Sequence, residues 1–156
     1  MKSGEWSLLF HRCLLEQLER LKAAADRAFA SDPLAAMGNA NVKLYDALAK
    51  LMLETVPDDP ARDEYRQGNT MGPEFRHWRR ARIGRRFRLF FRYDSRTKVI
   101  IYAWVNDQST LRAAGSGRDP YAVFQKMLTR GNPPDDWDSL LRQSRKPPAN
   151  QPLKRR

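Results

Sequence analysis

The chain of 156 residues is poor in the residue types that build disulfides and metal centres. It contains one cysteine, Cys13, and two histidines, His11 and His77. A single cysteine cannot close an internal disulfide, and it cannot supply the thiolates of a cysteine-ligated zinc or iron–sulfur site. Two imidazoles also argue against a metal enzyme. We therefore expect neither a bound metal nor another cofactor.

Long apolar stretches are missing as well. No apolar run approaches the roughly 20 residues that a membrane-spanning helix needs. The N-terminus lacks the basic start and apolar segment of a secretory signal peptide. The scarcity of cysteine is typical of a reducing compartment. We therefore expect a soluble, cytoplasmic protein that does not act at a membrane.

Acidic residues are absent from two segments that carry much of the basic charge. The net charge is +11, from 29 Lys and Arg against 18 Asp and Glu. Residues 76–92 hold eight arginines and no acid, and residues 142–156 hold six basic residues and no acid. The rest of the chain contains 15 basic and 18 acidic residues. Basic charge placed in this way points to a polyanionic partner, either nucleic acid or an anionic surface.

The remaining composition is that of one folded domain. Hydrophobic residues make up 41% and aromatic residues 10% of the chain, which is too much apolar material for a disordered protein. One domain is the expected count at this length. We predict that it spans residues 1–141 and that the basic, proline-containing residues 142–156 form a disordered tail.

Hydrophobic periodicity in the first third of the chain predicts one strand followed by two helices. Large apolar residues alternate through residues 6–11, which is typical of a short strand. Apolar residues then recur at helical spacing over 12–29. A second helical pattern passes through Leu44 and Leu48 and should end near Val56, because Pro57 disfavours its continuation.

The second half of the chain predicts an antiparallel sheet followed by short helices. Residues 78–83, 86–93 and 98–105 have strand character, and in the middle one the apolar and arginine positions alternate, which predicts a half-buried strand with a cationic outer face. Asp119 before Pro120 is typical of a helix start, and Asp135 or Asp136 can cap one more short helix. The expected fold is therefore α+β.

The arginines of neighbouring strands should repel one another. Arg80 and Arg82 share one strand face, and Arg86, Arg88 and Arg92 share a face of the next strand. Exposed strands do use charge to block edge pairing, but like charges facing each other across a strand pair destabilise the sheet. A protein tolerates this more readily when an anion normally covers the face. We therefore predict a sheet that binds RNA or DNA.

Several motifs in order resemble the YhaV-type toxins of the RelE-like superfamily, over roughly residues 6–141. They are the run Arg-Phe-Arg-Leu-Phe-Phe-Arg-Tyr at 86–93, Trp-Val-Asn-Asp at 104–107, Thr-Leu-Arg at 110–112, Tyr-Ala-Val-Phe-Gln-Lys-Met-Leu at 121–128, and Pro-Pro-Asp-Asp-Trp at 133–137. The resemblance implies a RelE-like domain, with two N-terminal helices packed on a mostly antiparallel sheet and short C-terminal helices.

The resemblance also implies a function. Such a protein would be the endoribonuclease toxin of a type II toxin–antitoxin system, cleaving mRNA on the ribosome and inhibiting translation and growth. A PrlF-like antitoxin with an AbrB-like fold would neutralise it, and the two together would bind operator DNA and repress their own operon. Cleavage would proceed without a metal, by attack of the ribose 2′-hydroxyl on the adjacent phosphate.

Site residues follow from matching this chain to the superfamily motifs. The paired basic residues of one strand match Arg80 and Arg82, and the arginine of the aromatic-Arg-Leu strand matches Arg88. The basic residue after the next strand matches Arg112, with Arg118 as the alternative, and the aromatic hydroxyl that opens the last helix matches Tyr121. The arginines expected to bind RNA around this site are Arg79, Arg85, Arg86, Arg92 and Arg118.

The identity of the proton acceptor is open at this stage. A guanidinium stays protonated, so an arginine stabilises phosphate charge and is a poor general base. Relatives carry a lysine where this chain has Arg80 and Arg82. Histidine is the side chain type best suited to accept a proton near neutral pH, so His77 is a candidate base. The simpler interpretation of His77 is a surface residue without a catalytic role. Tyr121 could transfer a proton, stack on a nucleobase, or pack in the core.

A second class of function fits the same charge pattern. A non-catalytic module that binds RNA, the ribosome or DNA needs only the basic face. An anionic-membrane binder fits less well, because the arginines follow a strand pattern and not the polar face of an amphipathic helix.

Overall fold

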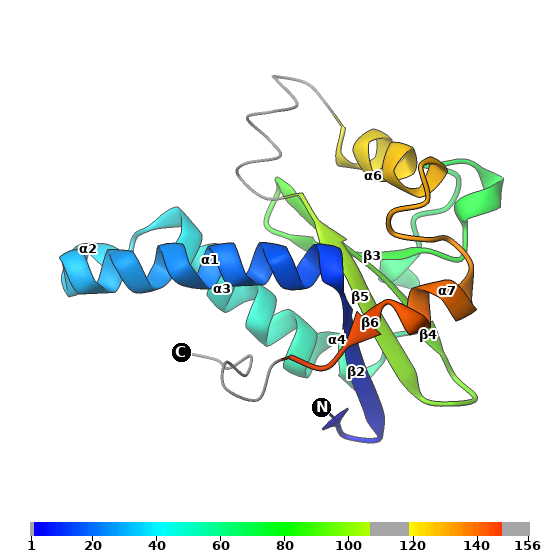
Figure 1. The fold of residues 1–156 in the computed structure, drawn as a ribbon, viewed down its shortest axis with the longest axis horizontal. Helices are drawn as coiled ribbons and strands as arrows, with labels where there is room; N and C mark the ends of the chain where they lie inside the picture. The colour runs from blue at the N-terminus through cyan, green and yellow to red at the C-terminus, as the bar shows by residue number, and fades with distance from the viewer. Residues whose placement is uncertain (1, 107–118, 148–156) are drawn as a thin grey trace.

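The structure is a computed structural model that describes residues 2–106 and 119–147. Its fold is α+β, with one mixed sheet that has helices on both faces (Figure 1). The strands are β1 (Lys2–Ser3), β2 (Trp6–His11), β3 (Arg79–Ile83), β4 (Phe87–Asp94), β5 (Val99–Val105) and β6 (Ser144–Arg145). The four strands predicted from the sequence are confirmed, with ends that differ by at most one residue.

The order of strands in the sheet is β1-β2-β5-β4-β3, and β6 also pairs with β2. The β2–β5 pairing is parallel, whereas β3–β4, β4–β5, β1–β2 and β2–β6 are antiparallel. The N-terminal strand β2 therefore lies in the interior of the sheet, and β3 forms one edge. Because strands β1 and β2 precede the first helix, helices are not the first elements of the chain.

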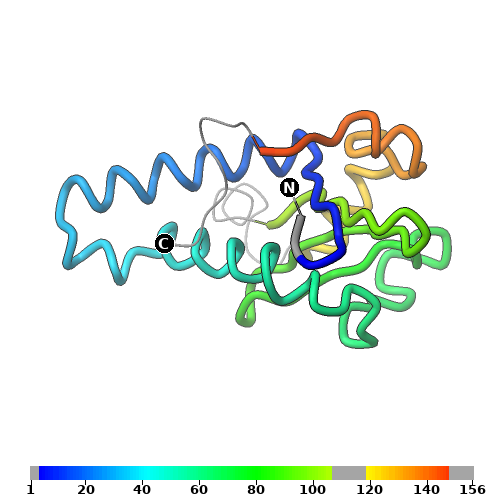
Figure 2. Tube along the Cα trace, turned by 90° about the horizontal axis from the view of Figure 1, so that it is seen from below, coloured from blue at the N-terminus to red at the C-terminus, as the bar shows by residue number. Residues whose placement is uncertain are grey.

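Helix α1 (Arg12–Ser31) is followed by the short α2 (Pro33–Ala36) and by α3 (Ala40–Lys50). Figure 2 shows α1 and α3 side by side, with α2 at the far end of the pair. Apolar side chains of α1 and α3, among them Leu14, Leu18 and Leu48, pack with Leu8 and Phe10 of β2 in the larger core cluster. This cluster covers one face of the sheet.

The second long helix does not end where the sequence predicted. After α3 it continues as a π-helical turn, η1 (Leu51–Thr55), and as α4 (Val56–Asp58). In the π register the carbonyl of Met52 would accept a hydrogen bond from the amide of residue 57, which Pro57 lacks. The hydroxyl of Tyr102 donates to this carbonyl instead, at 2.8 Å. A tertiary contact thus satisfies the acceptor that the proline leaves unpaired.

The opposite face of the sheet is covered by α6 (Pro120–Thr129) and α7 (Trp137–Arg142). Phe124 of α6 stacks on Phe90 at a centroid distance of 4.3 Å and on Trp104 at 5.6 Å. Asp119 and Asp136 accept hydrogen bonds from backbone amides at the helix starts, so both predicted N-caps are confirmed. The expected cationic outer face of β4 is therefore partly under helices, which corrects the sequence-based picture.

The folded part of the chain extends past residue 141. Arg142 is the last residue of α7, and β6 pairs with β2 through Phe10–Arg145 and His11–Ser144. Residues 142–145, which the sequence analysis assigned to the tail, thus belong to the fold. Within the described ranges, no helix is long and apolar enough to cross a membrane.

Candidate functional site

Arginines converge on one face of the edge strand β3 and its neighbour β4. In the register of this pair, Arg82 lies opposite Arg88, and Arg80 lies opposite Phe90. Because alternate residues of a strand share a face, the side chains of Arg80, Arg82, Arg88 and Phe90 project from the same side of the sheet. The structure therefore brings together three of the arginines predicted as catalytic.

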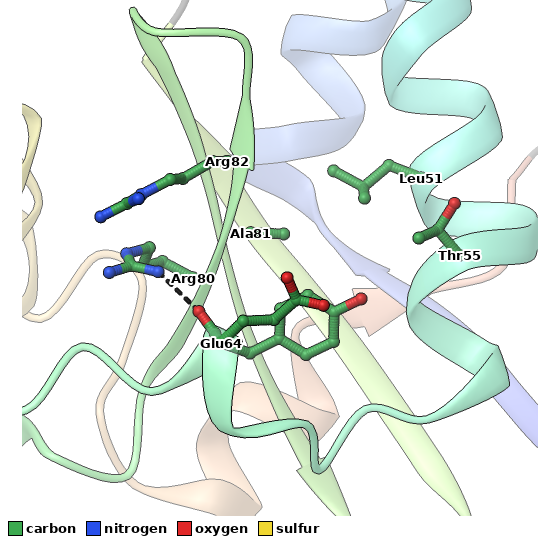
Figure 3. A pocket seen from close by; sticks show the side chains of 7 residues that line it. Leu51, Thr55, Glu64, Arg80, Ala81 and Arg82 are labelled. Carbon is green, nitrogen blue, oxygen red and sulfur yellow. Dashed lines mark hydrogen bonds between the residues drawn. The ribbon is translucent and has the colours of Figure 1, made fainter.

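Arg80 is held by two hydrogen bonds from different parts of the chain. Its Nε donates to the hydroxyl oxygen of Tyr121 at 2.7 Å. Its Nη1 donates to the carbonyl oxygen of Glu64 at 2.7 Å, the hydrogen bond that Figure 3 shows. Tyr121 lies in the first turn of α6, and its ring packs edge-on against Phe90 at 5.6 Å. The predicted residues Arg80 and Tyr121 are thus in direct contact.

Arg88 is positioned by a residue that sequence reasoning did not select, Asn106. The Asn106 side chain is buried, accepts the backbone N–H of Arg88 at 2.6 Å, and donates to the carbonyl of Arg86 at 2.8 Å. The sequence signal that could have identified Asn106 is its position, as a polar residue directly after the almost wholly apolar strand β5. Asn106 therefore fixes the backbone of β4 at its start. This is the part of the strand that carries Arg88 onto the face shared by Arg80, Arg82 and Arg88, which we call the cationic face.

The guanidinium of Arg88 retains unused hydrogen-bonding capacity. Its Nη1 donates to the carbonyl of Phe87 at 2.8 Å, while its buried Nε has no acceptor among the described residues. Within those residues, the ion pairs found involve none of Arg80, Arg82 and Arg88. Uncompensated like charges on one face make a site for an anion.

His77 is held by a contact with Asp135. Its Nε2 lies 2.6 Å from Oδ1 of Asp135, and the same oxygen accepts the indole N–H of Trp78 at 2.8 Å. Asp135 belongs to the connection between α6 and α7. His77 precedes β3, whereas Arg82 lies near the end of that strand. Among the residues that the structure describes, the contacts of His77 are with the carboxylate of Asp135 and with Trp78, and none is with Arg80, Arg82, Arg88 or Tyr121.

Arg92 is packed between aromatic rings. Its guanidinium carbon lies 5.8 Å from the ring centroid of Trp78 and 5.3 Å from that of Trp137, and its Nη1 donates to the carbonyl of Asp135 at 2.6 Å. Burial lowers the pKa of Arg92, and the neighbouring carboxylates of Asp135 and Asp136 offset part of that effect. These contacts give Arg92 a packing role, and we leave it out of the RNA-binding set.

The other predicted RNA-binding arginines are distributed differently. Arg79 projects from the opposite face of β3, and its guanidinium lies over the ring of Tyr93 at 5.7 Å. Arg85 and Arg86 are exposed in the hairpin between β3 and β4, beside Gly84, whose positive φ of 60° suits a glycine at this turn. Arg112 and Arg118 lie outside the described residues.

A cavity of about 200 Å³ lies beside the edge strand β3 (Figure 3). Leu51 and Thr55 of η1 line it on one side and residues 80–82 of β3 on the other, and Glu64 and Tyr65 of the short 3₁₀ helix η2 (Asp63–Tyr65) complete it. Figure 3 shows the side chain of Ala81 directed toward Leu51 and those of Arg80 and Arg82 directed away from it, so the cavity and the cationic face lie on either side of the edge strand β3. The described part of the chain contains no group of three or more His, Cys, Asp or Glu side chains that could hold a metal ion.

Comparisons with known proteins identify the family of the chain. Residues 8–145 match the Toxin_YhaV family, described as a toxin with endonuclease activity of a toxin–antitoxin system. The chain is 38% identical over 141 residues to the ribonuclease toxin YhaV of Escherichia coli strain K12. The alignment covers 89% of this chain and 92% of that protein. The toxin YhaV of Escherichia coli O157:H7 gives the same values. No solved structure matches the chain. Since the family match runs from β2 to β6 and includes the whole cationic face, the chain belongs to the YhaV family of toxins.

Proposed function

We propose that this protein is the endoribonuclease toxin of a type II toxin–antitoxin system and that it cleaves mRNA on the ribosome, inhibiting translation and growth. The observation that carries the proposal is the shared face of Arg80, Arg82 and Arg88, with the Tyr121 hydroxyl bonded to Arg80. The ribonuclease name of the YhaV relative supports the choice of RNA as substrate.

The proposed reaction is attack of a ribose 2′-hydroxyl on the adjacent phosphate. The 2′-oxygen gives up its proton to solvent water and forms a bond to phosphorus, the bond to the 5′-oxygen breaks, and the 5′-oxygen takes up a proton, so that a 2′,3′-cyclic phosphate and a 5′-hydroxyl result. Negative charge grows on the phosphate oxygens in the transition state, and we assign its stabilisation to Arg82 and Arg88, which share one face of the strand pair. One well-aimed donor of this kind contributes roughly 2.7–4 kcal/mol. The reaction as proposed uses side chains of the protein and no cofactor.

Tyr121 is the group that we assign to proton transfer. Its oxygen accepts the N–H of Arg80, so its own hydroxyl hydrogen is directed elsewhere and is available to donate. A donor held beside the phosphate-binding arginines can protonate the leaving 5′-oxygen as a general acid. We assign no step to His77, because its Nε2 is already paired with Asp135.

The partners follow from the same face. We propose a PrlF-like antitoxin with an AbrB-like fold, which places acidic residues on the cationic face, and joint binding of the complex to operator DNA in the cytoplasm. The absence of carboxylate partners for the face within the described residues supports an acidic antitoxin segment. We also place the fold in the RelE-like superfamily, supported by the packing of α1 and α3 on a sheet that contains the antiparallel β3-β4-β5 unit.

Induced expression tests the proposal. We expect the wild-type protein to stop growth and fragment mRNA, and Arg88→Ala to do neither. Arg27→Ala is the matched control, because it removes an exposed arginine of α1 and should remain as toxic as wild type. If the wild-type protein leaves growth and mRNA unchanged, the toxin assignment fails and a non-catalytic RNA-, ribosome- or DNA-binding module takes its place.

A further inference from the structure

The cavity beside β3 has a lining of mixed chemistry. Leu51, Ala81 and the ring of Tyr65 supply apolar surface, while Thr55 supplies a hydroxyl and Glu64 a carboxylate. A phosphate inside the cavity would meet the carboxylate of Glu64, and a purely apolar ligand would leave the polar groups unpaired. A nucleobase suits both kinds of surface, because it has flat apolar faces and a polar edge.

Position connects the cavity to the proposed cleavage face. On the edge strand β3, the side chain of Ala81 points toward Leu51 and the cavity, whereas those of its neighbours Arg80 and Arg82 point away from it (Figure 3) and share the cationic face with Arg88, so the two regions meet at the edge of the sheet. The hydrogen bonds to Tyr121 and to the Glu64 carbonyl hold the Arg80 guanidinium where the two regions meet. A phosphate bound at these arginines would bring the base of its own nucleotide to the cavity.

Size restricts the occupant. The cavity volume of about 200 Å³ is below the roughly 300–1,000 Å³ of pockets that enclose drug-sized ligands. It therefore suits one base, with the sugar and phosphate remaining outside on the arginines.

The carboxylate of Glu64 selects among the four bases. A carboxylate only accepts hydrogen bonds and takes two parallel N–H donors best. Guanine presents two adjacent donors, N1–H and its 2-amino group, whereas the pairing edges of adenine, cytosine and uracil place an acceptor next to the donor. The Glu64 side chain is 67% exposed and is paired only loosely, with Nη1 of Arg62 at 3.5 Å. A bound base can therefore replace that ion pair.

We propose that this cavity binds a guanine next to the cleaved phosphate and that Glu64 is a specificity-determining residue. The proposal rests on the endoribonuclease function proposed above, and it adds a sequence preference to that function. The wild-type enzyme should cut RNA at sites enriched in guanine at one fixed position relative to the cleaved bond.

Mapping of RNA 5′ ends after induction tests this proposal, whether or not cleavage needs the ribosome. We expect Glu64→Gln to retain cleavage and to lose at least tenfold of the guanine enrichment, because its amide cannot accept both donors. Glu19→Gln, which removes an exposed carboxylate from α1, is the control and should keep the wild-type pattern. Since the Glu64 side chain is largely exposed, the variant should fold, and its thermal midpoint can verify this.

The outcomes separate the two proposals. If the wild-type protein cuts RNA without guanine enrichment, or if Glu64→Gln keeps that enrichment, the base-binding proposal is wrong and the endoribonuclease function stands. If Glu64→Gln keeps the enrichment and instead weakens binding of the purified antitoxin, the cavity is a protein-docking site and the proposal is likewise overturned. If the wild-type protein cuts no RNA, the proposed function itself fails.

Discussion

Arg82 of β3 and Arg88 of β4 occupy directly opposite positions in the antiparallel pair. Directly opposed like charges destabilise a strand pair, in the range of roughly 0.2–1 kcal/mol per cross-strand contact. A carboxylate that would relieve this repulsion is missing from the ion pairs of the described residues. An anion bound at this face would reduce the repulsion between Arg82 and Arg88 and so stabilise the folded protein.

Replacing Arg82 should separate stability from activity. We expect Arg82→Thr to raise the free energy of unfolding by about 0.2–1 kcal/mol, with a larger gain at low salt because salt screens the repulsion. RNA cleavage should fall. Urea denaturation at low and high salt, together with a cleavage assay, checks both. Arg85→Thr is the control, because Arg85 lies in the hairpin and has no opposite residue in the register; an equal gain in that variant would contradict this explanation.

Loss of the Tyr121 hydroxyl should slow the chemical step. Tyr121→Phe keeps the ring that packs on Phe90 and removes the proposed proton donor, so the cleavage rate should drop about 10²- to 10⁴-fold. Single-turnover cleavage measures this drop. Tyr93→Phe removes a hydroxyl from a ring that packs against Trp6 and should cleave at the wild-type rate. A Tyr121→Phe enzyme of full activity would rule out the assigned role.

Asn106 should act through the backbone that carries Arg88. In Asn106→Ala the amide of Arg88 and the carbonyl of Arg86 lose their partners, which costs roughly 1–3 kcal/mol for each group left buried and unpaired. We expect a lower thermal midpoint and a lower turnover rate with an unchanged KM for RNA. Asn106→Asp should recover only the bond from the Arg88 amide, since a carboxylate cannot donate to the Arg86 carbonyl. Equal stability of the two variants would show that the hydrogen bond from the Arg88 amide contributes nothing.

Arg92 should matter for folding and not for RNA. Arg92→Met removes the hydrogen bond to the Asp135 carbonyl and the two stacking contacts with Trp78 and Trp137. We expect a loss of about 1–3 kcal/mol in unfolding free energy. The RNA affinity of the folded fraction should stay at the wild-type level. Filter binding at a temperature where the variant is folded checks this, and a weakened affinity there would return Arg92 to the RNA-binding set.

The buried His11 should make the protein less stable in mild acid. Burial lowers the pKa of His11, partly offset by its hydrogen bond with Gln143. The unfolded chain therefore binds the proton more readily, so stability is full above the ordinary pKa near 6.5 and declines as the pH falls through the lower, folded-state pKa. Thermal melts between about pH 5 and 8 follow this decline. His11→Asn keeps an N-cap acceptor for Cys13 and should show a flatter profile.

Local sequence patterns were sufficient to predict many of the secondary-structure elements of this protein. The strands at β2, β3, β4 and β5, the start of α1 and the caps at Asp119 and Asp136 follow from periodicity and capping, which depend only on neighbouring residues. The same holds for the opposed arginines, because a tight hairpin between β3 and β4 aligns Arg82 with Arg88. One exception was the end of the second helix, where the helix continues through Pro57 and the hydroxyl of Tyr102 pairs with the Met52 carbonyl.

The sequence by itself determined strands β2, β3, β4 and β5, the main helices, the α+β class and the position of the arginine cluster along the chain. Only the tertiary structure decided that β2 pairs in parallel with β5, that α6 brings Tyr121 to Arg80, and that Trp78 and Trp137 enclose Arg92. The physical reason is that these contacts join segments far apart in the chain. Their partners are chosen by burial of the shared core, and no local spacing encodes that choice.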